Sequence, residues 1–490
     1  MRDAISGLGR LMSFEQTVNE KTDCRIESSE EKGHRNENAK DRINVHRTSE
    51  GDNRGMAISH SAVQKDSEND PDFVSNFFKQ SRLHFIGSWK LRHSNIVRKI
   101  LEANEGRADV ITRHQVDRYI LHIDMDCFFA AVAIREEPQL KGLPIAICHA
   151  SENTLDTTST SEISAASYEA RKCGIRAGMF LGSAYRLCPA LIIRGYRFDL
   201  YESITSEFFS LLLNVSTIIE PVSCDEVYMD ITHVIARGSR IADVLRSIKD
   251  TILERTGCVA SIGCGRNKLL AKLASKKAKP DGIVDLSYLG KRDDNFSQGK
   301  LAVFMRNIPV TDLPGVGYVT SAQLQEAGLV TCGHLADASI EQIERTLGYK
   351  SPKKHSDPSK QSRQSTLVPV KESTTDVSAH DSDASPSSRV DLLRQLSIGL
   401  DRREVTFKSA VSQASIGAEI NYGIRFRTSN KLKKFMYDLS KEVATRMENA
   451  SVLGKTITLK VKRRKEDAPK VTTKYLGETR NFELLFGVKN

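Results

Sequence analysis

The segment LHIDMDCFFAAV, residues 121–132, puts two carboxylates into an otherwise apolar run. Asp124 and Asp126 are two positions apart, so in a strand both side chains would point to the same face. Like charges held together in a poorly solvated site repel each other, and one of them tends to take up a proton. A fold that keeps both acids in this apolar run therefore has to compensate their charge.

A second acidic pair stands at the start of another predicted strand. In VSCDEVYMDI, residues 222–231, Asp225 and Glu226 precede an apolar run. If this strand neighbours the first one, Asp124, Asp225 and Glu226 converge, and three carboxylates of this kind favour Mg²⁺. Two such ions about 4 Å apart can activate an attacking oxygen and neutralise a leaving phosphate. The spacing by itself fits solvated strand ends equally well.

Asp126 directly precedes a predicted helix, CFFAAVAIREEP, residues 127–138. A short acidic side chain at that position is a natural N-cap, because its oxygen accepts hydrogen bonds from the free amides of the first turn. We therefore expect Asp126 to cap the helix. Ligation of a metal ion is the alternative that the sequence leaves open.

Composition narrows the class of protein further. With 490 residues the chain is too long for a single core, so we expect several domains. Lys and Arg number 72 against 62 Asp and Glu, and the net charge of +10 suits a polyanion such as nucleic acid, although many basic proteins bind none.

The nine cysteines form no C-x-x-C pair, which is typical of reduced thiols in an intracellular protein. The sequence shows no signal peptide and no membrane span.

Changes in composition divide the chain. Residues 1–70 are polar, charged and poor in aromatic side chains, so we expect disorder there, and a polar insertion of the same kind at 351–388. Between them, RYILHIDMD and EVYMDIT are typical of strands, and CFFAAVAIREEP and SEISAASYEARKCGI of helices. The last part alternates like a sheet, in ASIGAEINYGIRF and KTITLKVKRRK, around an amphipathic helix, NKLKKFMYDLSKEVATRMENA.

Five motifs occur in the order found in the Y-family translesion DNA polymerases. They are HIDMDCFFAAV, SYEARKCGIRAGM, VSCDEVYMDI, SIGCGRNKLLAKLASKKAKPDG and LPGVG, and the resemblance covers roughly residues 73–480. Within this family, SRLHFIGSWK before the catalytic core and AEINYGIRF after the thumb resemble the deoxycytidyl transferase branch. That branch inserts dCMP opposite template guanine and abasic sites.

The resemblance implies an α+β fold: a right-hand polymerase with palm, fingers, a helix-hairpin thumb and a little finger. The implied domains are an N-terminal extension that completes the site at 71–118, palm and fingers at 119–305 with the fingers at about 148–197, a thumb at 306–410 and a little finger at 411–490. The chain ends before the second helix and the last strand of a family little finger. We therefore expect this domain to be incomplete, loosely held and weaker in its grip on DNA.

The resemblance also implies a site. Asp124 and Asp225 would bridge two Mg²⁺ ions, Glu226 would bind the ion near the primer 3′-hydroxyl, and the Met125 carbonyl would bind the nucleotide-bound ion; the three acids are the implied catalytic residues. The implied nucleotide contacts are the backbone amides of Cys127 and Phe128 at a helix N-terminus, the steric gate Phe129, and Ser167, Tyr168, Arg171 and Lys279. The implied DNA contacts are Ser81, Trp89, Pro314, Gly315, Val316, Gly317, Asn421, Tyr422, Gly423 and Arg425.

Arg82 would carry the most unusual chemistry. Cytosine presents two adjacent acceptors, O2 and N3, and a guanidinium fork offers two parallel donors, whereas thymine has a donor at N3 and would be rejected. The resemblance implies that Arg82 pairs with incoming dCTP while Leu83 fills the space of an evicted template guanine. Without the resemblance, Arg82 would be read as a surface charge, Phe129 as a core aromatic and LPGVG as an ordinary turn. The family usually has a hydroxyl residue where this chain has Ala165, so one phosphate contact is expected to be missing.

The sequence therefore predicts a template-directed deoxycytidyl transferase that binds primer–template DNA, dCTP and Mg²⁺ in the nucleus. A Y-family polymerase of broader selectivity and a non-catalytic DNA-binding regulator are the alternatives, the latter because the little finger is clipped. A two-metal nuclease would not need Phe129. Docking regions for other translesion polymerase subunits are not found in this sequence. VKRRK, residues 461–465, is either a nuclear address or a basic strand along phosphates.

Overall fold

The computed structural model describes residues 67, 69–92, 102, 117–149, 159, 161–290, 299–349, 386–406, 415–420, 424, 426–464 and 475–483. All of them belong to one compact unit of the chain, Gln64–Asn490. The predicted disordered segment at 1–70 and the predicted insertion at 351–388 lie almost wholly outside the described residues.

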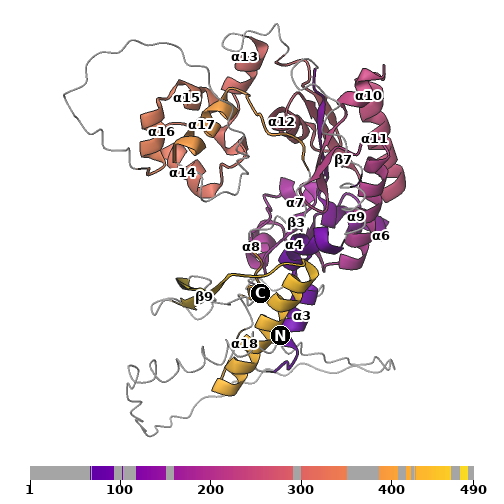
Figure 1. The fold of residues 1–490 in the computed structure, drawn as a ribbon. Coiled ribbons are helices and arrows are strands. Elements are labelled where there is room, and N and C mark those ends of the chain that lie inside the picture. The colour runs from indigo at the N-terminus through magenta and orange to yellow at the C-terminus, as the bar shows by residue number, and fades with distance from the viewer. Residues whose placement is uncertain are drawn as a thin grey trace, which may run out of the picture. The chain divides into compact units, whose positions relative to one another are not determined.

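A five-stranded sheet in the order β5-β6-β1-β7-β8 lies within residues 117–290. Its strand β7 is labelled in Figure 1. β1 lies between β6 and β7 and is antiparallel to both, whereas β7 and β8 are parallel. The predicted strands in RYILHIDMD and EVYMDIT are confirmed, and they are neighbours. The strands are β1 (Ile120–Met125), β5 (Ile219–Pro221), β6 (Glu226–Asp230), β7 (Ala260–Gly265) and β8 (Ile283–Asp285).

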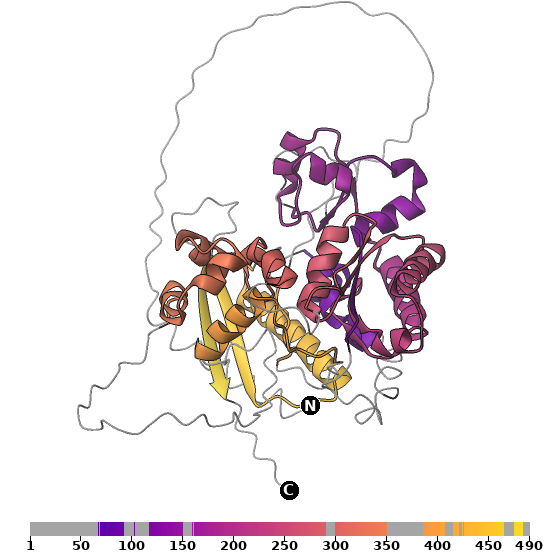
Figure 2. The same cartoon turned by 90° about the horizontal axis from the view of Figure 1, so that it is seen from above.

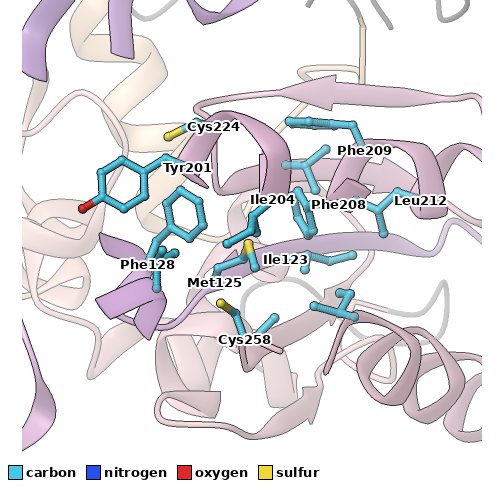
Figure 3. Close-up of a cluster of buried hydrophobic side chains, with 14 of the residues drawn as sticks. Ile123, Met125, Phe128, Tyr201, Ile204, Phe208, Phe209, Leu212, Cys224 and Cys258 are labelled. Carbon is cyan, nitrogen blue, oxygen red and sulfur yellow. The ribbon is translucent and has the colours of Figure 1, made fainter. Parts of the chain in front are cut away.

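The two faces of β1 have different partners. Leu121, Ile123 and Met125 are buried in a large apolar core shared with α9 and α11, part of which is shown in Figure 3. Ile120 packs with Ala271 of α12 on the other side of the sheet, and by alternation His122 and Asp124 face the same way. Figures 1 and 2 show the ribbon of this sheet and its helices from two directions. The helices around this sheet are α6 (Phe128–Glu136), α9 (Phe198–Leu213), α10 (Thr232–Ala236), α11 (Ile241–Thr256) and α12 (Lys268–Ala278), with a short 3₁₀ turn, η1 (Pro138–Leu140).

Two glycines of β7 let α12 approach the sheet very closely. A Cβ on Gly263 would lie 2.0 Å from the backbone N of Ser275, and a Cβ on Gly265 would lie 2.6 Å from the backbone N of Ala271. These are backbone atoms, so the helix itself would have to move. Asn267 starts α12 by accepting a hydrogen bond from the amide of Leu270 at 2.8 Å. The position of this basic helix is therefore fixed at both its start and its flank.

A smaller sheet in the order β3-β2-β4 carries the region predicted to be the fingers. The prediction of one helix over residues 161–175 is wrong in its first half, because Ala166 pairs with Ala146 in an antiparallel ladder. The helix begins only after Ser167, whose side chain accepts the amide hydrogen of Ala170. The elements are β2 (Ile145–Ile147), β3 (Ala165–Ala166), α7 (Tyr168–Lys172), α8 (Leu181–Leu187) and β4 (Ile192–Arg194).

Residues 299–349 and 386–397 form a helical group, as the sequence predicts. Its core includes Leu324, Leu335, Ile343 and Leu393, together with Leu273 of α12. The last helix starts inside the predicted insertion. The elements are α13 (Lys300–Arg306), a 3₁₀ turn η2 (Val310–Asp312), α14 (Tyr318–Glu326), α15 (Cys332–Asp337), α16 (Ile340–Thr346) and α17 (Pro386–Ser397).

The C-terminal part contains the predicted helix, α18 (Ser429–Asn449), and an antiparallel pair, β9 (Thr456–Arg464) and β10 (Tyr475–Glu483). None of the residues of α18 is buried. The strand predicted over residues 414–426 is not seen at its described positions, 415–420, 424 and 426.

Two N-terminal helices, α3 (Phe73–Gln80) and α4 (Arg82–Arg92), precede the central sheet. α3 contacts α18, where Phe73 and Phe435 share a small apolar cluster and the Lys434 ammonium donates to the Pro71 carbonyl at 2.8 Å. Among the helices that the structure describes, none combines the length and the apolar character needed to cross a bilayer.

Gly263→Ala should lower the free energy of unfolding by roughly 3 kcal/mol or more, because the added methyl group would collide with the backbone of α12. Overpacking typically costs about 1–3 kcal/mol even where neighbouring side chains can move. Urea unfolding followed by circular dichroism measures the change. Gly87→Ala in α4 is the matched control. Its new Cβ meets nothing within 4 Å, so stability should be kept or should rise by up to about 1 kcal/mol. Equal losses from the two variants would contradict the close approach of α12.

Candidate active site

The three predicted metal-binding acids lie at adjoining positions of β1 and β6. Asp124 is the direct partner of Glu226 in the antiparallel ladder, and the Met125 amide donates to the Asp225 carbonyl at 3.0 Å. Asp225 and Glu226 both contribute to raising the pKa of Asp124, so the carboxylates are close enough to repel each other. The predicted convergence of these three residues is thus present in the fold.

Lys279 compensates the charge of Asp124. Its ammonium lies 2.7 Å from Asp124 Oδ1 and 3.7 Å from Asp126 Oδ1, directly after the end of α12. Burial raises the pKa of Asp124 even so, against the opposing effect of Lys279. Burial alone would lower the pKa of Lys279, but the neighbouring carboxylates outweigh it and hold the pKa above its ordinary value. Lys279, predicted as a phosphate ligand, therefore serves here as the counter-ion of the acidic cluster.

Glu226 has two partners that the sequence reasoning missed. His122 Nε2 and Lys272 Nζ each lie 2.6 Å from Glu226 Oε1, and Ser275 Oγ lies 2.6 Å from the other ring nitrogen of His122. Burial alone would raise the pKa of Glu226, but His122 and Lys272 outweigh it and bring the pKa to about 2. The alternation of β1 was the available signal, since it puts His122 on the same face as Asp124.

Asp225 is the third acid, and its partner is a hydroxyl group instead of a cation. Ser223 donates to Asp225 Oδ1 at 2.5 Å. Burial raises the pKa of Asp225, and the charge of Glu226 raises it further. Of the three acids, Asp225 is thus the one whose charge is least compensated by a direct contact.

The donor set suits a hard divalent cation, because three carboxylates that repel one another gain from a shared positive charge. The carboxylate oxygens are, however, not arranged around a common metal position. Within the described ranges, no group of three or more His, Cys, Asp or Glu side chains is arranged to hold a metal ion. Lys279 and Lys272 occupy carboxylate oxygens instead, so both ammonium groups would have to give way to a metal.

The prediction that Asp126 caps the following helix is wrong. The residue that precedes α6 is Cys127, which has a left-handed φ of 50°, and no side chain caps this helix. Asp126 is 2% exposed and accepts hydrogen bonds from the Tyr168 hydroxyl at 2.9 Å, the Ser261 hydroxyl at 2.8 Å and the Asp281 amide at 2.6 Å. It therefore ties the small sheet region to the central sheet.

The predicted phosphate ligands of α7 have different surroundings. Arg171 lies over the ring of Tyr168, 5.0 Å from its centroid, and its Nε donates to the Ala166 carbonyl at 3.0 Å. Both side chains are half-buried. Ser167 does not fit a side-chain contact with a nucleotide, because it is 2% exposed and its hydroxyl bonds the Leu143 carbonyl and the amides of Ile145 and Ala170.

Phe129 lies on the first turn of α6, directly after Cys127 and Phe128 in the sequence. Its ring stacks on Tyr201 at a centroid distance of 4.3 Å and meets the edge of Tyr196 at 6.1 Å. With 7% of its surface exposed, Phe129 is a core aromatic. The role of steric gate remains a prediction.

Arg82 opens α4, close to the small sheet region. Burial lowers the pKa of His149, and the charge of Arg82 lowers it further. Burial raises the pKa of Tyr196, and the charge of Arg82 opposes this rise, so the guanidinium is near both side chains. Leu83 beside it is 68% exposed, which is unusual for a leucine. Since Tyr196 also contacts Phe129, Arg82 belongs to the same neighbourhood as the start of α6.

Two of the predicted DNA contacts are structural residues. Trp89 is 3% exposed and stacks on Phe209 of α9 at 5.2 Å, so it is a core residue and has no surface to offer to DNA. Ser81 is also buried, and its hydroxyl accepts the amide hydrogen of His84 at 3.3 Å at the start of α4. Trp89 thus anchors α4 to the central core, whereas the hydroxyl contact of Ser81 stays within the start of α4.

The glycine motif of the helical group is open to the surface. A Cβ on Gly315 or on Gly317 would meet nothing within 4 Å, and Gly315 has a φ of 84°, which favours glycine. Pro314 and Val316 belong to the same loop before α14. The remaining predicted DNA contacts lie outside the described residues: Asn421, Tyr422, Gly423 and Arg425.

Three family models match this chain. The impB/mucB/samB family matches residues 123–276, its C-terminal domain matches residues 413–486, and the DNA polymerase-iota thumb domain matches residues 311–354. A DNA polymerase IV from Halorhodospira halophila is 32% identical over 70% of this chain and 81% of its own length. The chain belongs to the Y family of DNA polymerases, the impB/mucB/samB family. The resemblance predicted from the five motifs is confirmed.

Other members of the Y family support the same membership. The DNA repair protein REV1 of Arabidopsis thaliana is 34% identical over 89% of this chain, and the rev1 protein of Schizosaccharomyces pombe is 31% identical over 85%. The chain spans 36% and 39% of the lengths of these two relatives. A solved structure, the Y-family DNA polymerase chimera Dbh-Dpo4-Dbh, matches 74% of this chain and 88% of its own with a TM-score of 0.53 and 22% identity, which confirms the right-hand polymerase fold.

Lys279→Met should lower the free energy of unfolding by about 1–3 kcal/mol at pH 7, because Asp124 would then be ionised without its counter-ion in a partly buried place. The loss should shrink as the pH falls toward 3.8, the ordinary pKa of the carboxyl group, since protonation then removes the uncompensated charge. Urea titrations between pH 7 and pH 4 measure both effects.

Lys276→Met on the same helix is the control, since the Lys276 side chain is 62% exposed and pairs with Asp312. Its cost should stay below about 1 kcal/mol and should change little over this pH range. A pH-independent loss in Lys279→Met would contradict the pairing with Asp124.

Proposed function

We propose that this Y-family protein is a translesion polymerase of the REV1 type that adds dCMP from dCTP to a DNA primer opposite template guanine or abasic sites. The single observation that carries the proposal is the juxtaposition of Asp124, Asp225 and Glu226 on β1 and β6. The basic side chains Lys279 and Arg171 lie at this site and in the adjoining region, which suits a substrate with a triphosphate. The REV1 relatives support the choice of branch.

Two Mg²⁺ ions fit the proposal. Asp124, Asp225, Glu226 and the Met125 carbonyl would hold them, with carboxylate oxygens as the hard ligands that Mg²⁺ prefers. When bound, the ions would lower the pKa of the primer 3′-hydroxyl and neutralise charge on the triphosphate. Lys279 and Lys272 neutralise the acids in this structure. Once metal ions supply that positive charge, the two ammonium groups would be able to bind phosphate oxygens.

The residues around the acids would position the nucleotide. The amides of Cys127 and Phe128 stand at the start of α6, and the left-handed backbone of Cys127 turns the chain sharply there. Tyr168 and Arg171 would approach the phosphates from α7. The ring of Phe129, held by Tyr201, would oppose a ribose 2′-hydroxyl and so favour deoxynucleotides.

Arg82 would choose the base. A guanidinium that forms two parallel hydrogen bonds with cytosine O2 and N3 has no equivalent partner on thymine. Its place near Tyr196 and Phe129 and the exposure of Leu83 beside it support this role. A nuclear location is also proposed, on the basic run VKRRK at residues 461–465 and on the DNA substrate.

Asp225→Asn should reduce dCMP incorporation opposite any template by on the order of a thousandfold or more, because a neutral amide cannot replace the charge that a two-metal site needs. Single-nucleotide primer extension with Mg²⁺ measures the rate. Asp243→Asn is the matched control, since Asp243 is an exposed acid of α11, and its variant should keep full activity. Appreciable turnover by Asp225→Asn would refute the assignment. No incorporation by the unaltered chain would favour the non-catalytic alternative.

Arg82→Ala should reduce the preference for dCTP by about tenfold to a hundredfold, the value of one good bidentate contact to a base. Extension across an abasic site, with each of the four nucleotides supplied separately, measures the preference. Arg240→Ala removes an exposed arginine far along the chain, on a side chain that is 82% exposed, and should leave the preference intact. An unchanged preference for dCTP in Arg82→Ala would exclude the guanidinium as the selecting group.

A further inference from the structure

His122 is a buried histidine with a partner on each ring nitrogen. Nε2 lies 2.6 Å from Glu226 Oε1, and Nδ1 lies 2.6 Å from the hydroxyl oxygen of Ser275. The residue is 1% exposed and stands in β1, two positions before Asp124. Its imidazole therefore connects one of the three acids to α12, although the proposed function gives it no task.

Three elements hold this ring in place. Tyr228, the ladder partner of His122 on β6, meets it with ring centroids 4.6 Å apart and the planes at 60°. Gly263, its ladder partner on β7, makes room for α12, because a Cβ there would lie 2.0 Å from the backbone N of Ser275. This close approach brings the Ser275 hydroxyl to Nδ1. The imidazole is thus fixed from both neighbouring strands and from the helix.

The contact with Glu226 determines which ring nitrogen carries a hydrogen. Glu226 Oε1 also accepts a hydrogen bond from the Lys272 ammonium at 2.6 Å, and a carboxylate in such an ion pair offers only lone pairs. His122 Nε2 must therefore be the donor. A hydroxyl group can donate or accept, so Ser275 fits Nδ1 with or without a hydrogen.

The two partners of Glu226 differ in how firmly they are placed. Lys272 is 43% exposed and carries its charge on a flexible stem, so it can leave Oε1. The His122 ring is enclosed by the sheet and α12 and cannot follow. When positive charge from elsewhere replaces Lys272, His122 is the partner that stays with this carboxylate.

We infer that His122 is a positioning residue for Glu226, whose Nε2–H holds the carboxylate in one orientation and so prepares it to share a divalent cation with Asp124 and Asp225. Groups that orient metal-binding side chains typically change metal affinity or activity by about 10–100-fold when they are removed. The inference rests on the proposed function in one respect, because the cation belongs to that function. The hydrogen bond to Glu226 does not depend on it.

Two variants separate positioning from simple filling of the core. His122→Leu removes the donor, whereas His122→Gln keeps an N–H group for Glu226. Mn²⁺ is the probe, because its electron paramagnetic resonance signal reports the free ion, and the full chain is titrated without DNA or nucleotide. The binding that Asp225→Asn abolishes is taken as specific.

His122→Leu should raise the Kd for specific Mn²⁺ binding by about 10–100-fold, and His122→Gln should recover most of the affinity. His334→Leu, at an exposed position of α15, is the control and should bind as the unaltered chain does. A histidine that only fills the core predicts the opposite order, since a leucine replaces it there better than a buried amide does. Equal affinity of His122→Leu and the unaltered chain would overturn the inference, as would a lack of recovery in His122→Gln.

A spectrum of the unaltered chain tests the hydrogen bond without any metal and without relying on the folding of a variant. The chain contains 12 histidines, which are labelled with ¹⁵N and observed through long-range proton–nitrogen correlations at neutral pH. The signal of His122 is the one that disappears in His122→Gln. Its Nε2 should carry a hydrogen, and a hydrogen on Nδ1 alone would refute the contact with Glu226.

Primer extension with dCTP adds a kinetic test. If the proposed function holds, His122→Leu should lower kcat and leave the KM for dCTP nearly unchanged, because His122 supports an acid and touches no nucleotide. A raised KM with unchanged kcat would contradict the positioning role. An unaltered chain without polymerase activity would count against the proposed function alone, since the Mn²⁺ titration and the spectrum need no turnover.

Discussion

Electrostatic compensation at the meeting of β1 and β6 is the constraint on which the arrangement depends. Asp124, Asp225 and Glu226 stand at adjoining positions, where their mutual repulsion and partial burial would favour protonation. The positive charges that oppose this come from α12 and the residue after it, Lys272 and Lys279. The closest packing described for the glycines of the chain, at Gly263 of β7, serves the same end, because it brings that helix against the sheet.

The same charge balance would allow one set of residues to be stable both without and with bound metal ions. Each ammonium group now does part of what a divalent cation would do, so a metal would exchange with lysines and would not enter an open, fully charged cage. Asp126 accepts hydrogen bonds from three neutral donors, Tyr168, Ser261 and the Asp281 amide, while the Lys279 ammonium lies 3.7 Å from its Oδ1. The bond from Tyr168 ties α7 to the central sheet region.

Local sequence patterns predicted most helices and strands of this site. They did not predict the contacts that particular side chains make in the folded structure. The apolar runs predicted β1 and β6, and the acids lie together because these strands are neighbours, which the sequence left open. The apolar run after Asp126 predicted α6. The cap failed because the left-handed turn at Cys127 carries Asp126 away from the helix amides, which no pattern signals. The burial of Trp89 has another cause. It follows Phe85 by four positions on one face of α4, and both rings stack on α9, Phe85 on Phe198 and Trp89 on Phe209. His122 and Lys272 were missed because only the folded register brings them to Glu226.

Under the proposed function, this anchoring of α4 separates the choice of base from the chemistry of the acids. Phe85 and Trp89 fasten the helix to α9, while Arg82 and Leu83 remain at its free end near Tyr196. None of the three acids contacts α4 in the described hydrogen bonds and ion pairs. If Arg82 selects the base as proposed, a substitution at this residue would alter selectivity without disturbing the charge balance at β1 and β6. The proposed selectivity could therefore change by a single substitution at Arg82. The acids, the lysines that neutralise them and the glycines that contact α12 depend on one another, so they would have to change together.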